Sequence, residues 1–112
     1  MGWQRGFDRT SPLASLIAAT DAVIASGRAT YGQRCMPCHG ERGRGDGPLA
    51  APLDPRPGDL VLHVPQHNDG ELYYFVSRGV PGTAMPTWRD VLTETQRWEL
   101  VAYLRTLAGG GR

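Results

Sequence analysis

Lysine is absent from this 112-residue sequence, and all 12 basic residues are arginine. The 11 acidic residues are interspersed with the arginines, and the formal net charge is only +1. Because the sequence has neither a strong positive excess nor a long run of one sign, its composition gives no reason to propose nucleic-acid binding. No stretch approaches the ~20 consecutive apolar residues of a membrane-spanning helix, so we expect no spanning segment within this sequence.

The N-terminal region offers only a weak case for a secretory leader. Arg5 and Arg9 precede the short apolar run LASLIAA, and Asp21 prevents a longer one. We therefore interpret residues 1–19 as an N-terminal arm, residues 20–108 as one small domain, and residues 109–112 as a flexible tail.

Glycine and proline are abundant, with 15 and 9 residues respectively. This composition indicates long loops between few regular elements. A chain of this length buries only about two-thirds of its unfolded surface, so a modest apolar core must carry the stability. A bulky cofactor at the centre of the domain would relieve that difficulty.

Three helices are predicted, and the sequence contains no convincing strand. Each helix follows or begins at a residue whose side chain can cap the first free backbone amides. The second and third also have the glutamate or glutamine, three residues on, that completes a capping box. The predicted helices cover about 21–34 after Thr20, the stretch from Asn68 to Gly79, and about 93–107 from Thr93.

Two further features bear on how these helices are arranged. Gly27 lies on the same face of the first helix as Tyr31, and a glycine in mid-helix costs roughly 1 kcal/mol relative to alanine. This cost suggests a close helix crossing at Gly27, and the alternative is an ordinary glycine that the helix tolerates. Residues 40–69 are predicted to form one long loop, which is uncommon in a compact domain unless the loop has a function or wraps something.

Both cysteines lie in the stretch RCMPCHG at residues 34–40. Cys35 and Cys38 form a C-x2-C…H-x3-H set with His63 and His67, but 24 residues separate Cys38 from His63. Zinc fingers have about 12–15 residues there. A redox-active dithiol normally follows a strand and starts a helix, whereas here a helix precedes the cysteines and no strand is visible. The pattern therefore disfavours both a zinc site and a dithiol.

The third interpretation is covalent haem, because C-x-x-C-H is the attachment signature of c-type haem. Cys35 and Cys38 would form thioether bonds with the two vinyl groups of one haem, and His39 would be the proximal iron ligand. The turn GTAMPTW offers Met85 as a second axial ligand. Thioether sulfur stabilises Fe(II), so a His/Met pair raises the reduction potential.

In this order and spacing, the motifs resemble those of the class I cytochromes c, in particular the bacterial type with CxxCH, a GxGDGP loop and a distal MPxW motif. The resemblance covers roughly residues 20–108. It implies an all-α, small cytochrome c fold, in which three main helices with long loops wrap around one covalently bound haem. The matching stretches are Gly27 to Tyr31, Cys35 to Gly40, Gly43 to Pro48, and Met85 to Trp88.

The resemblance also implies the roles of individual residues around this haem c. The iron would be held by His39 and Met85. The second ring N–H of His39 would donate to a backbone carbonyl, which the resemblance places at Pro48. Trp88 would pack on the haem or donate its N–H to a propionate. Burial in the core is the simpler alternative for Trp88.

We predict that the domain is an electron-transfer protein rather than an enzyme, because both axial positions of the iron would be filled. It would carry single electrons to or within a respiratory complex, such as a terminal oxidase or nitrite reductase. The alternative is a haem enzyme or gas-sensing module whose sixth iron position, at Met85, is open or labile. A bis-histidine haem using His63 or His67 is a further alternative.

The same resemblance implies the partners and the compartment. A redox protein donor and a redox protein acceptor are expected, for example an oxidase copper centre or another cytochrome. Such domains face the periplasm or the outer side of the bacterial cytoplasmic membrane. A membrane tether outside this chain is compatible with that location.

Overall fold

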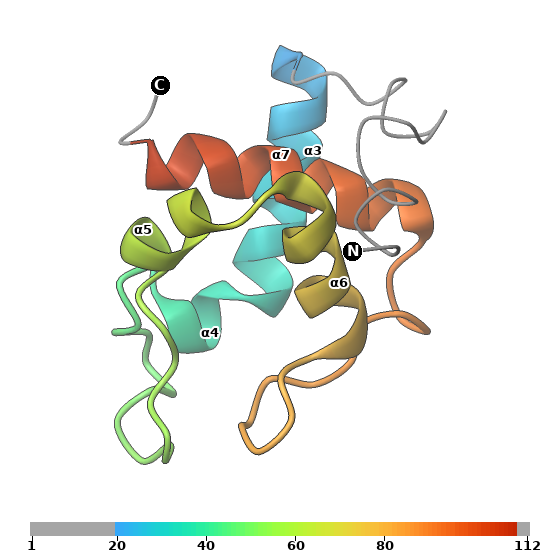
Figure 1. Cartoon of the computed structure of the whole chain (residues 1–112). Coiled ribbons are helices and arrows are strands. Elements are labelled where there is room, and N and C mark those ends of the chain that lie inside the picture. Colours follow the sequence, from blue (N-terminus) through green and yellow to red (C-terminus); the bar gives the residue numbers. More distant parts are fainter. Residues whose placement is uncertain (1–19, 110–112) are drawn as a thin grey trace.

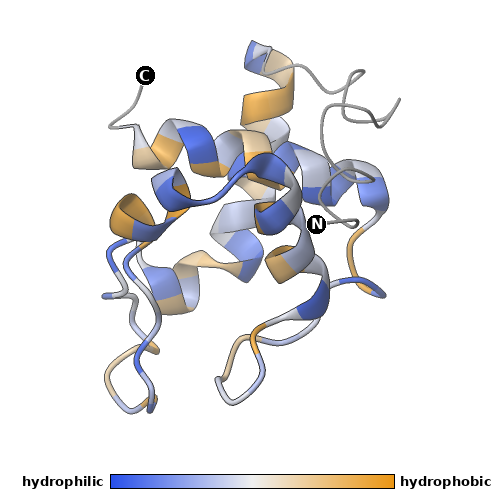
Figure 2. Ribbon diagram, viewed as in Figure 1, coloured by the Kyte–Doolittle hydropathy of each residue, from blue (hydrophilic) through white to orange (hydrophobic). Residues whose placement is uncertain are grey.

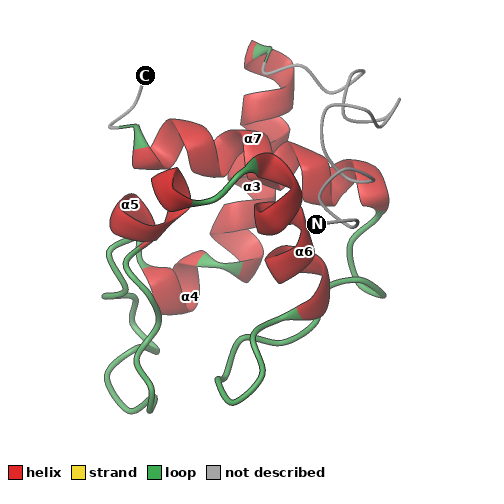
Figure 3. Cartoon of the chain, viewed as in Figure 1, coloured by secondary structure: helices red, strands yellow, loops and turns green. Residues whose placement is uncertain are grey.

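The computed structural model describes residues 20–109, and this part of the chain consists of helices and loops without a strand (Figures 1 and 3). The expected all-α class is therefore confirmed. The predicted arm, 1–19, and residues 110–112 of the predicted tail lie outside the described residues. The elements are α3 (Asp21–Arg34), α4 (Met36–His39), α5 (Leu60–His63), the 3-10 helix η1 (Val64–Gln66), α6 (Asp69–Arg78) and α7 (Glu94–Ala108).

The three longest helices begin where the sequence predicts. The Thr20 side chain accepts a hydrogen bond from the first turn of α3. Helices α6 and α7 begin with complete capping boxes, formed by Asn68 with Glu71 and by Thr93 with Gln96. Each box satisfies two backbone amides that have no partner inside the helix, which explains why these local signals locate the helix starts. None of the helices in the described part has the length and apolar character needed to cross a bilayer.

Helices α3 and α7 cross in close contact, as expected from Gly27 (Figure 1). A Cβ atom on Gly27 would lie 2.8 Å from the Cβ atom of Tyr103 and would overlap the backbone carbonyl of Glu99. One turn further along α3, the ring of Tyr31 lies 5.3 Å from the ring of Tyr103, measured between centroids. Glycine at position 27 therefore sets the distance between the two helices.

The apolar core lies between α3, α6 and α7. Leu100 of α7 is fully buried, and Val64 of η1 is 2% exposed. Trp98 of α7 stacks on Tyr73 of α6, with ring centroids 4.2 Å apart and planes inclined by 15°. The remaining buried members of this cluster are Tyr31, Leu72, Val76, Leu92, Val101 and Leu104.

The prediction of one uninterrupted loop over 40–69 is wrong at its C-terminal end, where α5 and η1 form. Asp59 caps α5, because its Oδ1 accepts from the amides of Val61 at 3.0 Å and Leu62 at 3.4 Å. Helix α5 is one of the apolar segments in Figure 2. Its Leu60 packs against the core cluster, whereas Leu62 remains 60% exposed. Elements of four and three residues are too short to show a helical period in the sequence.

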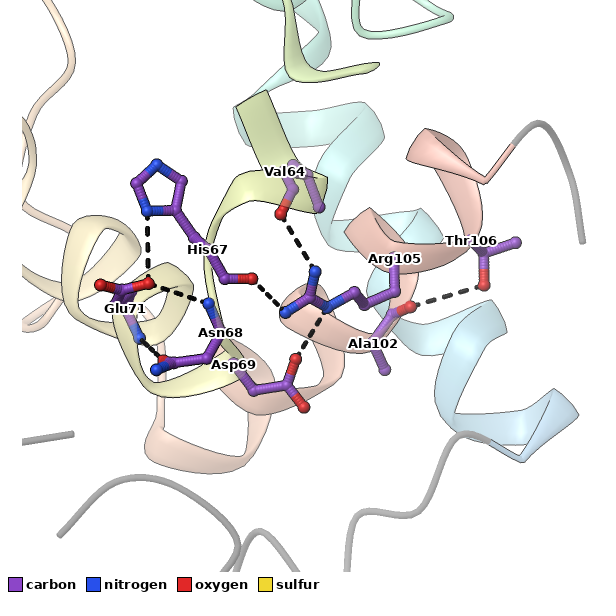
Figure 4. A network of polar contacts seen from close by, with 8 residues as sticks. All are labelled: Val64, His67, Asn68, Asp69, Glu71, Ala102, Arg105 and Thr106. Atoms are coloured by element: carbon purple, nitrogen blue, oxygen red, sulfur yellow. Dashed lines mark hydrogen bonds and ion pairs between the residues drawn. The ribbon is translucent and has the colours of Figure 1, made fainter. Parts of the chain in front are cut away.

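Arg105 of α7 holds this short helical region against the rest of the domain (Figure 4). Its Nη1 donates to the carbonyl of Val64 at 3.0 Å, and its Nη2 donates to the carbonyl of His67 at 2.5 Å. Its Nε forms an ion pair with Asp69 at 2.8 Å. One arginine thus connects the end of η1 and the start of α6 to α7.

Candidate functional site

The two cysteines and His39 lie on a single helical turn that directly follows α3. The amide of Cys35 donates to the carbonyl of Tyr31 at 2.9 Å, which completes the last turn of α3. The Cys35 carbonyl then accepts from the amides of Cys38 at 3.2 Å and His39 at 2.9 Å. Neither cysteine is in a disulfide, and both are half-buried. The turn therefore presents two thiols and an imidazole from one short, hydrogen-bonded segment.

The glycine-rich loop after this turn packs against the backbone of α4. The amides of Gly45, Gly47 and Leu49 donate to the carbonyls of His39, Cys38 and Pro37, at 2.8, 3.0 and 2.8 Å respectively. These carbonyls at the end of α4 have no partner within the helix. The loop therefore acts as an extended C-terminal cap for α4, and fixes the turn that carries the cysteines.

The close packing of Gly47 and the backbone conformation of Gly40 explain why this cap requires glycine. A Cβ atom on Gly47 would lie 2.5 Å from the carbonyl oxygen of Met36 and 2.6 Å from the carbonyl carbon of Pro37. Gly40, which ends α4, has φ +87°, a conformation that favours glycine. Its carbonyl accepts a hydrogen bond of 2.5 Å from the buried Tyr31 hydroxyl. Tyr31 thereby links the end of the turn to the α3/α7 crossing.

His39 is held through one ring nitrogen. Its Nδ1 lies 3.1 Å from the carbonyl oxygen of Gly58. Burial lowers the pKa of His39 below its usual value, and the hydrogen bond to Gly58 opposes this effect only in part. A neutral imidazole must donate from Nδ1 to a carbonyl, so Nε2 is left as the free electron-pair donor.

The prediction that the Pro48 carbonyl accepts this hydrogen bond is wrong in this structure, because the acceptor is Gly58. Pro48 is exposed and lies between Gly47 and Leu49, whose amides both donate to α4. Those bonds place the start of the loop beside the α4 backbone. A later part of the loop, ten residues further along the chain, reaches the imidazole.

The zinc and dithiol interpretations find no support in this geometry. Burial, followed by the charge of Cys38, raises the pKa of Cys35 to about 12. Reactive dithiols instead need a thiol whose pKa is lowered. Residues 20–109 contain no group of three or more histidine, cysteine or acidic side chains placed to hold a metal ion. His67 contacts Glu71 at 3.4 Å instead.

Met85 lies half-buried on the loop between α6 and α7. Its carbonyl accepts from the Val80 amide at 3.4 Å, and its own amide donates to Thr83 Oγ1 at 3.1 Å. Gly79, which ends α6 with φ +73°, leaves room for this turn, since a Cβ atom there would lie 2.7 Å from the Met85 carbonyl oxygen. The loop thus folds back onto the end of α6, with Met85 at its return point.

Trp88 connects the Met85 loop to the end of α3. It is half-buried and packs against the core cluster. The guanidinium carbon of Arg34 lies 5.6 Å from the centroid of its ring, a cation–π contact. Arg34 directly precedes Cys35, so this contact joins the segment with the two thiols to the segment with the thioether. Sequence reasoning did not identify Arg34.

These side chains make up a donor set that fits a c-type haem. Cys35 is a neutral thiol one helical turn from the second thiol, His39 has Nε2 available, and the thioether of Met85 is on a separate loop. Both long loops extend on the same side of the α3/α7 pair as α4 (Figure 1). His63 is exposed and His67 pairs with Glu71. Met85 is half-buried and held by hydrogen bonds within its loop, so Met85 is the better candidate for the second axial ligand.

Comparison with known proteins identifies the family. The family described as "Cytochrome C oxidase, cbb3-type, subunit III" matches residues 22–104. The chain belongs to this family. The matched residues include all of α4, the glycine-rich loop and the Met85 loop. Membership in the cbb3-type subunit III family implies a cytochrome c domain with haem c and a role in electron transfer.

A solved structure has a similar fold. A chain of the reducing HAO-like protein complex of Kuenenia stuttgartiensis superimposes with a TM-score of 0.71 and 29% sequence identity. The match covers 80% of this chain and 46% of the other chain, so our chain spans less than half the length of that relative. No curated protein matches the sequence.

Proposed function

We propose that this domain binds one haem c covalently through Cys35 and Cys38 and transfers single electrons, with His39 and Met85 as the axial iron ligands. The observation that carries this proposal is the geometry of α4. One capped helical turn presents both thiols, and the Gly58 carbonyl holds His39 so that Nε2 is free to bind a metal. The bound haem would supply the Fe(III)/Fe(II) couple.

The attachment chemistry needs neither an oxidant nor a reductant. Cys35 and Cys38 would each add an S–H bond across one vinyl double bond, so that a C–S bond would form and the thiol hydrogen would go to the neighbouring carbon.

Met85 distinguishes an electron carrier from a haem enzyme. A methionine ligand would close the sixth position and raise the reduction potential, which suits a carrier. An enzyme or gas sensor needs that position open or readily vacated. The hydrogen bonds of Met85 within its loop, and the packing of Trp88 nearby, favour the closed form.

The working partners of the domain would be a redox protein donor and a redox protein acceptor, such as an oxidase copper centre or another cytochrome. Both comparisons favour a domain that works within a larger assembly, since the family is an oxidase subunit and the similar structure belongs to a complex. A periplasmic or outward-facing location on the bacterial cytoplasmic membrane follows from the covalent haem, with any tether lying outside the described residues.

Optical spectroscopy of the oxidised holoprotein tests the ligand assignment. Met85→Ala should abolish the methionine–iron charge-transfer band and lower the reduction potential, because water or another donor replaces the thioether. Met36→Ala is the matched control, since Met36 lies between the two cysteines and is 36% exposed. An unchanged band in Met85→Ala, or loss of the band in Met36→Ala, would overturn the assignment.

A further inference from the structure

One buried arginine contacts both ends of the loop that carries Met85. This loop leaves α6 at Gly79 and enters α7 at Thr93. Arg97, in the second turn of α7, donates from Nη1 to Ser77 Oγ at 2.7 Å and from Nε to the Thr93 carbonyl at 3.3 Å. Its guanidinium also lies over the Tyr73 ring, 5.1 Å from the centroid. Arg97 is only 8% exposed, and its hydrogen bond to Ser77 is buried, whereas that to the Thr93 carbonyl is part-buried.

Ser77 connects Arg97 to the loop that carries Met85. Its carbonyl accepts a hydrogen bond of 2.5 Å from Thr87 Oγ1 and one of 3.1 Å from the Arg89 amide. Ser77 is 6% exposed and lies two residues before Gly79. The side chain of Ser77 is thus fixed by Arg97, while its backbone fixes the loop two and four residues beyond Met85.

We propose that Arg97 is a positioning residue for Met85, which keeps the loop closed and so sets how readily another ligand displaces the thioether from the iron. This inference rests on the proposed function, because it requires Met85 to be the sixth ligand. Without the guanidinium, the Ser77 hydroxyl loses a buried partner, and the Thr93 carbonyl keeps only its hydrogen bond from the Arg97 amide. The two ends of the loop are then no longer linked through one side chain.

Displacement of Met85 by an added ligand measures this effect. Imidazole binds the oxidised iron only when Met85 has left, so its apparent affinity is proportional to the fraction of open loop. Arg97→Met keeps an unbranched apolar stem against Tyr73 and removes both hydrogen bonds. We expect imidazole to bind this variant about tenfold more tightly or better, since hydrogen bonds to a charged group are among the strongest in a protein.

Arg105→Met is the matched control. Arg105 is also an arginine of α7 with several hydrogen bonds, but its partners are Val64, His67 and Asp69, away from the Met85 loop (Figure 4). Both variants should lower the free energy of unfolding in denaturant. Only Arg97→Met should change imidazole affinity, with Arg105→Met staying within about twofold of the parent because distant, independent sites behave additively.

Two further variants test whether the change in imidazole affinity comes from the Arg97 contacts rather than from a general loss of structure. Ser77→Ala removes one of the two hydrogen bonds of the Arg97 side chain, and should raise imidazole affinity by an intermediate factor. Arg97→Lys keeps the charge but cannot reproduce the forked contact, so it should recover only part of the parent behaviour.

The outcomes separate this inference from the proposed function. Equal affinities in the parent, Arg97→Met and Ser77→Ala would overturn the positioning role, as would the same increase in Arg105→Met. Parent protein that lacks the methionine–iron band would overturn the ligand assignment, and the positioning role of Arg97 with it.

Discussion

The two halves of the candidate site are held in different ways. The segment from Cys35 to Gly58 is fixed by backbone hydrogen bonds, because three loop amides cap α4 and the Gly58 carbonyl holds His39. The Met85 loop has backbone bonds of its own, such as that from the Arg89 amide to the Ser77 carbonyl, but its two ends are linked through the side chains of Arg97 and Ser77.

This difference indicates which positions of the candidate site tolerate substitution and which do not. Backbone contacts depend on conformation and on the absence of a Cβ atom, so the cysteine-bearing half tolerates few substitutions at its glycines. Side-chain contacts can be removed one at a time without changing the course of the chain. The contacts that hold the Met85 loop could therefore be altered while the turn that carries the two cysteines stays the same.

The largest expected effect concerns the attachment itself. The double variant Cys35→Ala, Cys38→Ala should retain no covalently bound haem, because no thiol remains to form a thioether. Haem staining after denaturing electrophoresis measures this directly. Met36→Ala lies between the two positions and should stain like the parent. A haem-stained band that persists in the double variant would exclude attachment through these cysteines.

The next effect tests the backbone contacts of the cysteine-bearing half. Gly47→Ala places a Cβ atom against the Met36 and Pro37 backbone and should lower the free energy of unfolding by about 1–3 kcal/mol. Gly32→Ala is the control, because nothing lies within 4 Å of a Cβ atom there and the residue is inside α3. It should stabilise the protein by roughly 0.5–1 kcal/mol. Denaturant unfolding of both holoproteins decides the point. Equal effects would mean that the loop does not pack on α4.

The smallest effect concerns the contact that joins the two halves. Arg34→Gln removes the guanidinium over Trp88 and should cost about 0.5–1 kcal/mol, as expected for a cation–π contact at an exposed site. Arg28→Gln, exposed on the same helix, is the control for loss of charge. Thermal unfolding of the two variants provides the measurement. If Arg28→Gln lowers the midpoint as much as Arg34→Gln, the contact with Trp88 contributes nothing.

Local signals explain what could be predicted from the sequence. Thr20, Asn68 and Thr93 cap their helices through residues three positions away, so a short stretch of sequence is enough to locate each helix start. Gly27 indicated a close helix crossing, because a mid-helix glycine is costly unless the space is needed, but it did not identify α7 as the partner. The motif at Cys35 to His39 could be recognised because all of its residues lie within five consecutive positions.

The missed contacts join residues that are distant along the chain. The Gly58 carbonyl that binds His39 lies 19 residues away, and the sequence does not distinguish it from the other carbonyls of the long loop. Arg97 and Arg105 look like surface cations of an ordinary helix, yet their partners Ser77, Asp69 and Val64 lie 20 to 41 residues earlier. Only the packing of α7 on α6 and η1 reveals what these arginines do.

The short sequence separation of the contacts around α4 also bears on the order of assembly. Every hydrogen bond that caps α4 or holds His39 closes a loop of fewer than 20 residues, so little chain entropy opposes its formation. The link between the two ends of the Met85 loop instead joins residues 20 positions apart and needs α7 in place, because Arg97 belongs to that helix. During folding, the turn that carries both thiols would therefore form before Arg97 links the two ends of the Met85 loop. The later of these contacts would be the one that, under the proposed function, keeps Met85 in place.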